Sequence, residues 1–416
     1  MSKQETEIVT FGCRLNAYES EIMKAHVAAT GLKDAIIFNT CAVTAEAERQ
    51  VRQSIRKARR QYPHKKIIVT GCAAQINHKT YLAMEEVDQV IGNHEKLKEE
   101  SFLPANDQPI LLSDIMDIKE TADHLITGFD GKTRAFAQVQ NGCDHRCTFC
   151  TIPYGRGNSR SVPLEQIITQ VQSFVQEGYK EVVLTGVDIT SYGHDLPGTP
   201  TLGQMMHRLL AAVPSLPRLR LSSVDPVEID ADVFRLLETE PRFMPHLHIS
   251  LQAADDLILK RMKRRHLRQD IIMFCEKARR VRPDVVFGAD IIAGFPTETE
   301  AHFENTRRII ETCDITYVHA FPYSPRPGTP AARMPQVDRL TVKERAQTLR
   351  AEAQKSLDRY LTRQIGTTHY VLVEQEGEGR TEHFASVVFD KAPLPGKIIK
   401  VHIIAKEGDK LRGEIV

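Results

Sequence analysis

The run Gly142-Cys143-Asp144-His145-Arg146-Cys147-Thr148-Phe149-Cys150 holds three cysteines at a C-x3-C-x2-C spacing. Four thiolates would saturate a [4Fe–4S] cluster, so three thiolates leave one iron open to another ligand. The spacing therefore indicates a cluster that works as a reaction centre. The alternative is a zinc ion with His145 as the fourth ligand. Structural zinc sites usually pair two C-x2-C knuckles, or one knuckle with two histidines, and the sequence has no second knuckle.

This run follows a predicted strand that opens a long series of alternating strands and helices. The pattern predicts strands at 135–140, 181–186, 218–223, 246–252, 285–292 and 316–321, with helices such as 163–177 and 300–312 between them. Such a series is typical of a full or partial β/α barrel, whose chemistry lies at the carboxyl ends of its strands. The cysteine run directly follows the first strand, which is where such chemistry is expected.

A second set of cysteines ends three short apolar runs, 8–13, 35–41 and 66–72. Helical stretches such as 17–30 and 45–61 follow them, which predicts a doubly wound parallel sheet with a binding crevice at the carboxyl ends of its strands. We therefore expect Cys13, Cys41 and Cys72 to converge on a second three-cysteine cluster. The alternative for each is a buried small apolar residue, but Gly12, Gly71 and the polar pair 39–40 favour a close-approach loop.

The remaining segments are simpler. Residues 100–133 form a connection, with a loop at 103–109 and a turn at 129–132. A polar helix is expected at 340–363. It precedes alternating strands at 368–375, 383–389 and 397–405, which predict a small all-β barrel. Cys275 and Cys313 lie in helical patterns and read as packing residues.

Composition sets broad limits on the class of protein. A chain of 416 residues that is 41% hydrophobic has room for two or three domains. No stretch reaches the roughly 20 apolar residues of a membrane span, and the start has no signal-peptide pattern, so we expect a cytoplasmic protein without a membrane partner. In that setting eight cysteines favour reduced thiols that serve as ligands or in catalysis.

The net charge of +1 excludes a uniformly basic protein, yet positive charge is concentrated in segments 48–60 and 260–268. Local basic patches fit a polyanionic partner held at one face. The alternative is that each segment is a solvated helix face.

The run CDHRCTFCTIPYGRGNSRS at 143–161, together with the earlier cysteine trio, resembles the radical S-adenosylmethionine methylthiotransferases. More narrowly it resembles the MtaB type, the branch that modifies N6-threonylcarbamoyladenosine in tRNA. The resemblance covers the whole chain. It implies an N-terminal flavodoxin-like domain at 3–110, a radical core with a partial TIM-like barrel at 129–359, and a C-terminal RNA-binding barrel of the TRAM or oligonucleotide-binding kind at 362–416.

The resemblance also implies two [4Fe–4S] clusters and S-adenosylmethionine as both radical source and methyl donor. Cys143, Cys147 and Cys150 would hold the cluster that cleaves S-adenosylmethionine. The other trio would hold or deliver the sulfur. A methylthio group would replace the hydrogen on carbon 2 of an adenine next to the anticodon. The partners would be a tRNA anticodon stem-loop, a flavodoxin-like or ferredoxin-like electron donor and a sulfur donor.

Further positions carry over from the resemblance as candidate cofactor contacts: Phe149, Gly186, Asp188, Gln252, Asp290 and Gly294. Ordinary roles in core packing, turns and helix caps are the alternatives for each. Arg156 and Arg160 lie beside the cysteine run. Because arginine binds carboxylates and phosphates bidentately, we expect these two to meet a substrate carboxylate or phosphate, such as the threonyl carboxylate of the proposed nucleoside.

Two other functions fit parts of the sequence. One is a methylthiotransferase acting on an aspartate of a ribosomal protein, which would share the clusters and the architecture. The other is a zinc-bound RNA-binding module without catalysis. The residues after the cysteine run and the basic segments favour the RNA-modifying enzyme.

Overall fold

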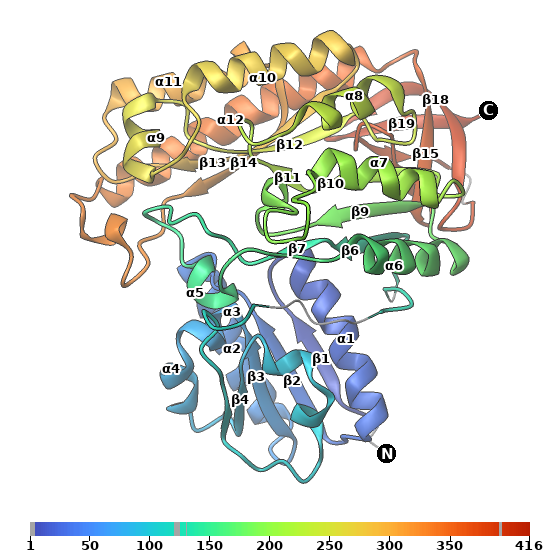
Figure 1. Ribbon diagram of the computed structural model, residues 1–416. Helices are drawn as coiled ribbons and strands as arrows, with labels where there is room; N and C mark the ends of the chain where they lie inside the picture. Colours follow the sequence, from blue (N-terminus) through green and yellow to red (C-terminus); the bar gives the residue numbers. More distant parts are fainter. Residues whose placement is uncertain (1–4, 120–124, 130, 391–392) are drawn as a thin grey trace. The chain divides into compact units, whose positions relative to one another are not determined.

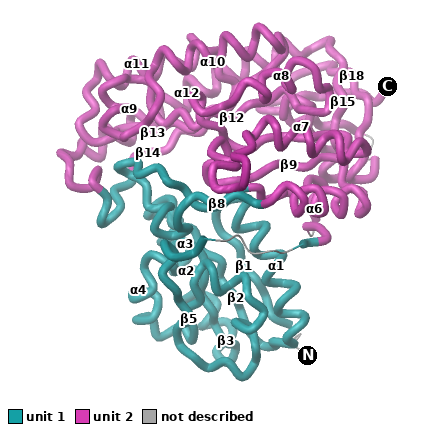
Figure 2. The backbone as a smooth tube through the Cα atoms, viewed as in Figure 1, with its two compact units in different colours: residues 1–126, 140–162, 324–329 teal, residues 127–139, 163–323, 330–416 magenta. Residues whose placement is uncertain are grey.

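The structure is a computed structural model that describes residues 5–119, 125–129, 131–390 and 393–416. These residues form two compact units, shown in teal and magenta in Figure 2. Unit 1 contains residues up to 126 together with 140–162 and 324–329, and unit 2 contains the rest. The predicted connection and turn before residue 133 include positions outside the described residues, as does the start of the predicted domain 3–110.

Unit 1 is built on a five-stranded parallel sheet in which the strands lie in chain order (Figure 1). The strands are β1 (Glu7–Thr10), β2 (Ala35–Thr40), β3 (Lys66–Gly71), β4 (Gln89–Ile91) and β5 (Ile110–Leu111). The predicted parallel sheet is confirmed, but the strand order lacks the reversal that defines the flavodoxin arrangement.

Helices cover both faces of this sheet because neighbouring strand residues point to opposite sides. Ala35 and Ile37 pack with α1 (Arg14–Thr30), whereas Ile36 and Phe38 pack with α2 (Ala45–Gln61). Short helices complete the layer: α3 (Cys72–Ile76), α4 (His78–Leu82), η1 (Glu95–Leu97) and η2 (Glu99–Phe102).

The cysteine run lies in a separate loop of unit 1. Strands β7 (Gln140–Asn141) and β8 (Arg160–Ser161) pair antiparallel at its base, and α5 (Ile152–Arg156) follows the last cysteine. This loop groups with the N-terminal sheet rather than with the strands that surround it in sequence.

Unit 2 contains the predicted partial β/α barrel as two parallel sheets. The first is β6 (Arg134–Gln138), β9 (Glu181–Thr185) and β10 (Arg218–Leu221). The second is β11 (Ser223–Val224), β12 (His246–Gln252), β13 (Val286–Ala293) and β14 (Ile315–Pro322). All six predicted strands are present, with the third interrupted between β10 and β11.

Helices connect these strands and end at recognisable caps. They are α6 (Leu164–Gln176), η3 (Ile189–Ser191), α7 (Leu202–Ala212), α8 (Ala231–Thr239), α9 (Asp256–Met262), α10 (Arg268–Val281), α11 (Glu300–Thr312), η4 (Pro330–Arg333) and α12 (Arg339–Arg363). Thr299, for example, accepts the backbone N–H of His302 at the start of α11.

The C-terminal residues form a closed five-stranded barrel within unit 2, as predicted. Its strands are β15 (Thr368–Gln375), β16 (Glu378–Arg380), β17 (Ser386–Val388), β18 (Ile398–Glu407) and β19 (Lys410–Ile415). The core joins residues of the barrel to Leu361 of α12 and Val286 of β13. None of the described helices is both long and apolar enough to cross a lipid bilayer.

Candidate active site

The two ends of the C-x3-C-x2-C loop are fixed by close backbone packing where the chain enters and leaves it, beside β7 and β8. Gly142 has a φ of +72°, and a Cβ atom there would lie 1.8 Å from the carbonyl oxygen of Asn158. Only glycine at this position allows the two chain segments at the base of the loop to approach so closely. The backbone N–H of Cys143 donates to the carbonyl of Gly157 at 3.1 Å, which fixes the first cysteine at the base of the loop.

Local hydrogen bonds also set the positions of the other two cysteines. Arg146 donates to the carbonyl of Cys143 and to Oδ1 of Asn158, both at 2.8 Å. The backbone N–H of Cys150 donates to the carbonyl of Cys147 at 3.1 Å, which makes a turn. All three cysteines and Phe149 are partly exposed rather than core residues. The three cysteines therefore do not belong to a closed apolar core.

The second trio lies at one edge of the sheet of unit 1. Cys41 and Cys72 directly follow β2 and β3, and Cys13 stands three residues after the end of β1; the three strands are parallel neighbours. Gly12 has a φ of +95°, and a Cβ atom there would lie 2.9 Å from Sγ of Cys41. Cys13 is exposed, and the other two are buried. The three strand ends therefore lie beside one another, and the binding of one cluster by the three cysteines stays a prediction.

The thiols of this trio are close enough to influence one another. Burial, together with the negative charges of Cys72 and Cys13, raises the pKa of Cys41 to about 11. The backbone N–H of Val43, 3.5 Å from Sγ of Cys41, and the cation of Arg156 act in the opposite direction. A buried thiol that is surrounded by other thiols favours a state in which a cation neutralises them together.

Helix α5 brings the cysteine loop against this second trio within unit 1. It packs on α3, and a Cβ atom at Gly155 would lie 3.2 Å from Cβ of Cys72. Asn93 donates both to the carbonyl of Gly155 and to Sγ of Cys72, the latter at 3.6 Å. Since α5 begins two residues after Cys150, the structure brings both cysteine sets into one compact unit.

Arg156 is buried behind the second trio, with its side chain 2% exposed. Its guanidinium pairs with Glu19 at 2.8 and 3.0 Å and donates to Oδ1 of Asn16 at 2.6 Å. Glu19 also binds Nζ of Lys96 at 2.7 Å. Burial alone would raise the pKa of Glu19, but the two cations outweigh that effect and lower the pKa to about 2.

Arg160 is also buried, and it donates to the backbone carbonyls of Ile118 (3.0 Å) and Arg156 (2.8 Å). The expectation that Arg156 and Arg160 meet a substrate carboxylate is not supported by these positions. Both side chains face protein groups because the loop packs onto the sheet, a contact that neighbouring sequence does not reveal.

Unit 2 places the other candidate residues at or near the carboxyl ends of its strands. Gly186 and Asp188 follow β9, Gln252 ends β12, and Gly294 follows β13. Gln252 and Gly294 have φ values of +66° and +72°. At Gly294 a Cβ atom would lie 2.5 Å from Cγ2 of Val342, so this glycine is needed for packing against α12.

Asp290 lies on β13 between two histidines of neighbouring strands. Its Oδ1 is 3.2 Å from Nε2 of His248 and 3.2 Å from Nδ1 of His319. Burial would raise the pKa of Asp290, but the hydrogen bonds from the two histidines outweigh it and hold the pKa well below its usual range. Asp290 is thus an ionised group between two imidazoles.

The donor set fits a cluster better than a zinc ion. A zinc–sulfur bond is about 2.3 Å long, so two sulfurs on one zinc lie at most about 4.6 Å apart. Across the described residues, no cysteine belongs to a group of three ligands whose donor atoms all lie within 4.8 Å of one another. Cys275 and Cys313 are almost fully buried, as their packing role predicts.

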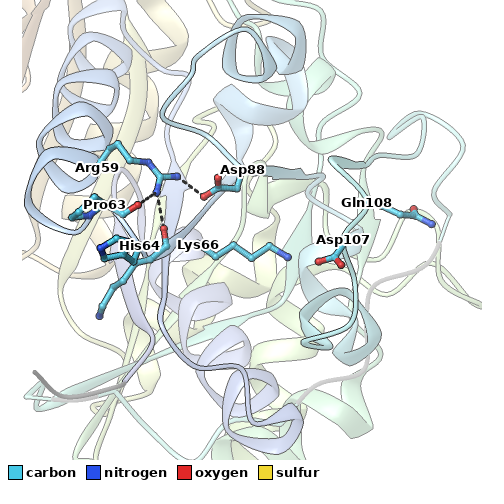
Figure 3. Close-up of a pocket in the computed structure, with 8 residues that line it drawn as sticks. Arg59, Pro63, His64, Lys66, Asp88, Asp107 and Gln108 are labelled. Atoms are coloured by element: carbon cyan, nitrogen blue, oxygen red, sulfur yellow. Dashed lines mark hydrogen bonds and ion pairs between the residues drawn. The ribbon is translucent and has the colours of Figure 1, made fainter.

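The two basic segments are largely engaged in ion pairs and hydrogen bonds. On α2, Arg49, Arg52 and Arg56 pair with neighbouring glutamates. Arg59 pairs with Asp88, donates to three backbone carbonyls, and lines a pocket of about 400 Å³ at the amino edge of the sheet (Figure 3). This engagement favours structural roles for much of the first segment.

The second basic segment behaves in the same way. Arg264 pairs with Asp225 at 2.8 Å, and Arg261 donates to Oγ1 of Thr297 at 2.7 Å. Lys260 lies on the exposed side of α9. Several arginines of this segment thus fasten unit 2 internally, which adds a structural role to the two interpretations of a patch for a polyanion and a solvated helix face.

Sequence reasoning missed Glu19, Lys96, His248 and His319. Glu19 gave one usable signal, because it lies on the buried face of α1 among Leu15, Tyr18, Ile22 and Met23. A charged residue on an apolar face needs a buried partner. The other three offered no local pattern.

Comparison with known proteins agrees with this architecture. A model described as the radical SAM superfamily matches residues 138–310, and one described as uncharacterized protein family UPF0004 matches residues 5–92. The radical S-adenosylmethionine methyltransferase TsrM from Kitasatospora setae aligns with a TM-score of 0.56 at 14% identity, covering 80% of this chain and 77% of TsrM. This likeness supports the fold.

Sequence relatives extend over nearly the whole chain. The threonylcarbamoyladenosine tRNA methylthiotransferase MtaB of Rickettsia prowazekii (strain Madrid E) is 56% identical over 401 residues, which is 96% of this chain and 95% of the relative. MtaB of Bacillus subtilis (strain 168) is 34% identical over 418 residues, with 95% and 92% covered. The tRNA-2-methylthio-N(6)-dimethylallyladenosine synthase of Cereibacter sphaeroides (strain ATCC 17023) is 32% identical over 429 residues, with 98% and 97% covered. The chain therefore belongs to the radical S-adenosylmethionine methylthiotransferases, in the branch of the MtaB type.

Proposed function

We propose that this enzyme adds a methylthio group to carbon 2 of N6-threonylcarbamoyladenosine next to the anticodon of tRNA. The relatives that carry this substrate in their names span almost the full chain. One structural observation carries the proposal. Two cysteine trios lie in the same unit, and α5 follows one of them while packing against the other.

In this proposal Cys143, Cys147 and Cys150 hold one [4Fe–4S] cluster, and Cys13, Cys41 and Cys72 hold a second. When bound, these groups and S-adenosylmethionine supply a 5′-deoxyadenosyl radical, a transferable sulfur and a methyl group. The protein holds the ligands in place: Gly142 and Arg146 set the loop, and Gly12 leaves room for Cys41.

The proposed contacts of S-adenosylmethionine are polar side chains and glycine backbone groups at the strand ends of unit 2. They are Gly186, Asp188, Gln252, Asp290 and Gly294, which lie at or near the carboxyl ends of β9, β12 and β13. The positive φ values of Gln252 and Gly294 bring backbone groups to the ends of β12 and β13, where ligands of such barrels bind.

The RNA partner is an anticodon stem-loop, whose unstacked bases suit recognition by a protein. The target adenine must leave its stack to be modified, so we propose that it is extruded. The C-terminal barrel supplies backbone contacts, as oligonucleotide-binding barrels do. A reducing protein of the flavodoxin or ferredoxin kind and a sulfur donor complete the partners, and the enzyme works in the cytoplasm.

Iron content and tRNA composition test this function together. The anaerobically purified chain should bind about eight iron atoms, and replacing either cysteine trio by alanine should leave about four. In a deletion strain, mass spectrometry of tRNA nucleosides should lose 2-methylthio-N6-threonylcarbamoyladenosine and keep the unmethylthiolated form. The wild-type gene should restore it, and neither triple variant should.

Other outcomes would point to the rival functions. Unchanged tRNA nucleosides in the deletion strain, combined with the loss of a methylthioaspartate from a ribosomal protein, would replace the RNA substrate by that protein. A colourless chain that holds zinc and no iron would remove the catalytic proposal altogether.

A further inference from the structure

A buried cluster of charges with an excess of positive charge lies behind the second cysteine trio. Glu19, Lys96 and Arg156 have side chains that are 1%, 0% and 2% exposed. The single carboxylate binds both cations, Lys96 at 2.7 Å and Arg156 at 2.8 Å. One carboxylate balances only one of the two cations, so the group as a whole carries one net positive charge.

Burying an uncompensated charge is costly unless another charge faces it. The negative groups that favour the charge of Arg156 are Cys72, Glu19 and Cys13. Burial lowers the pKa of Lys96, and its ion pair with Glu19 and the nearby Cys72 act against that effect to favour the cation. Arg156 in turn acts on Cys41. All three thiols of the trio therefore face the excess positive charge, and Glu19 is the one carboxylate among these groups.

Two asparagines, Asn16 and Asn39, connect these cations to the backbone beside the cysteines, and a third, Asn93, joins Cys72 to α5. Arg156 donates to Asn16, which in turn donates to the carbonyls of Phe11 and Thr40, at 2.7 and 3.0 Å. These carbonyls stand just before the turns that carry Cys13 and Cys41. Lys96 donates to Oδ1 of Asn39 at 3.2 Å, on the strand that leads to Cys41.

Asn93 makes the corresponding link to the third cysteine by donating to Sγ of Cys72 and to the carbonyl of Gly155. Gly155 precedes Arg156 in α5. The positive charge and the ligand loops therefore form one hydrogen-bonded assembly. Its charged groups are buried, where electrostatic effects are strong, and Cys13 is its exposed member.

We propose that Arg156 and Lys96 are positioning residues whose excess positive charge stabilises the negatively charged metal group held by Cys13, Cys41 and Cys72 and raises its reduction potential. The inference rests on the proposed function, in which this trio binds a [4Fe–4S] cluster. Net charge and hydrogen bonds near the sulfurs are known determinants of cluster potential. Glu19 sets the size of the effect, because it neutralises one of the two cations.

Substitutions that change the charge in known steps test this idea. They are made in a full-length chain with Cys143, Cys147 and Cys150 replaced by alanine, so that only the second trio binds iron. Arg156→Gln makes the buried group neutral, and Glu19→Gln gives it two positive charges. The double variant Glu19→Gln with Lys96→Met restores the single positive charge of the native group.

The readouts are iron and sulfide per chain and the midpoint potential from a titration followed by electron paramagnetic resonance. We expect Arg156→Gln to lower the reduced-to-oxidised ratio roughly tenfold at a fixed potential, which is about 59 mV for a one-electron couple. Glu19→Gln should shift the potential in the positive direction. The double variant should return close to the parent value.

Arg59→Gln is the matched control, because Arg59 pairs with Asp88 in the same unit but at the amino edge of the sheet (Figure 3). A six-residue strand separates the two edges by roughly 20 Å, so the midpoint potential of the Arg59→Gln variant should match that of the parent.

A parent chain that binds no iron would defeat the proposed function itself. If iron stays bound and the potential is unchanged, or shifts the same way in Arg156→Gln and Glu19→Gln, the electrostatic role is wrong. If Arg156→Gln fails to fold, the sign of the Glu19→Gln shift decides.

Discussion

Replacing Gly12 by alanine should damage the second cysteine site more than it damages the fold. The residue has a φ of +95°, and the added methyl group would lie 2.8 Å from Cβ and 2.9 Å from Sγ of Cys41. Positive φ costs alanine about 1–2 kcal/mol. Crowding a packed site costs about 1–3 kcal/mol more. The free energy of unfolding should therefore fall by about 2–5 kcal/mol.

Gly31 offers a matched control because it ends α1 with a φ of +70° and has nothing within 4 Å of its added Cβ. Alanine at Gly31 should thus show the backbone cost alone, about 1–2 kcal/mol. Urea unfolding of the apoproteins gives both free energies, and iron analysis after anaerobic reconstitution gives the occupancy.

The expected result is about eight iron atoms per chain for Gly31→Ala and about four for Gly12→Ala, since only the second trio is displaced. If Gly12→Ala lowered the free energy of unfolding no more than Gly31→Ala and still bound about eight iron atoms, the close approach of Gly12 to Cys41 would not be needed for stability or for the second cluster.

Three further outcomes follow from other parts of the structure. Thr44→Ala removes the side chain that accepts the N–H of Ala47 at the start of α2, and should lower the free energy of unfolding by about 1 kcal/mol, seen as a lower melting temperature. Burial raises the pKa of Glu298 to about 7 despite its ion pair with Arg345, so the native state binds more protons than the unfolded state between pH 4.5 and pH 7. Stability should therefore fall as the pH rises through that window. A Glu298→Gln variant whose stability kept the same slope would contradict this assignment. The affinity for an anticodon stem-loop should fall steeply with salt, and replacing the exposed Lys400 of β18 by glutamine should reduce the slope of log K against log salt by about 0.7–0.9. An unchanged slope would remove Lys400 from the RNA-contacting surface.

The sequence predicted most accurately those elements whose ends are decided locally. The bounds of α2 and α11 agree with the predicted helices because Thr44 and Thr299 cap them with their own side chains. In the C-terminal barrel, β16 and β19 were missed. Both are rich in charged residues and glycine, so no apolar alternation marks them, although each pairs through a tight turn with the strand before it.

In the candidate site, too, features that depend on local sequence were predictable and features that depend on distant partners were not. The convergence of Cys13, Cys41 and Cys72 follows from the parallel order of their strands, so a local pattern was sufficient. The wrong expectation for Arg156 arose because its partner Glu19 lies 137 residues away in sequence. A basic residue beside a reactive loop looks like a substrate contact until its tertiary partner is known.

Unit 1 is assembled from three separate stretches of chain, and this limits how the protein can be dissected. Glu48 takes its buried partner Arg326 from the last stretch, and Glu19 takes Arg156 from the middle one. A fragment that stops near residue 110 would keep the sheet and the three strand-end cysteines but would lose both arginines. Such a truncated fragment would contain every sulfur ligand of the second site and still be an electrostatically different protein, so measurements of its metal chemistry would not transfer to the intact enzyme.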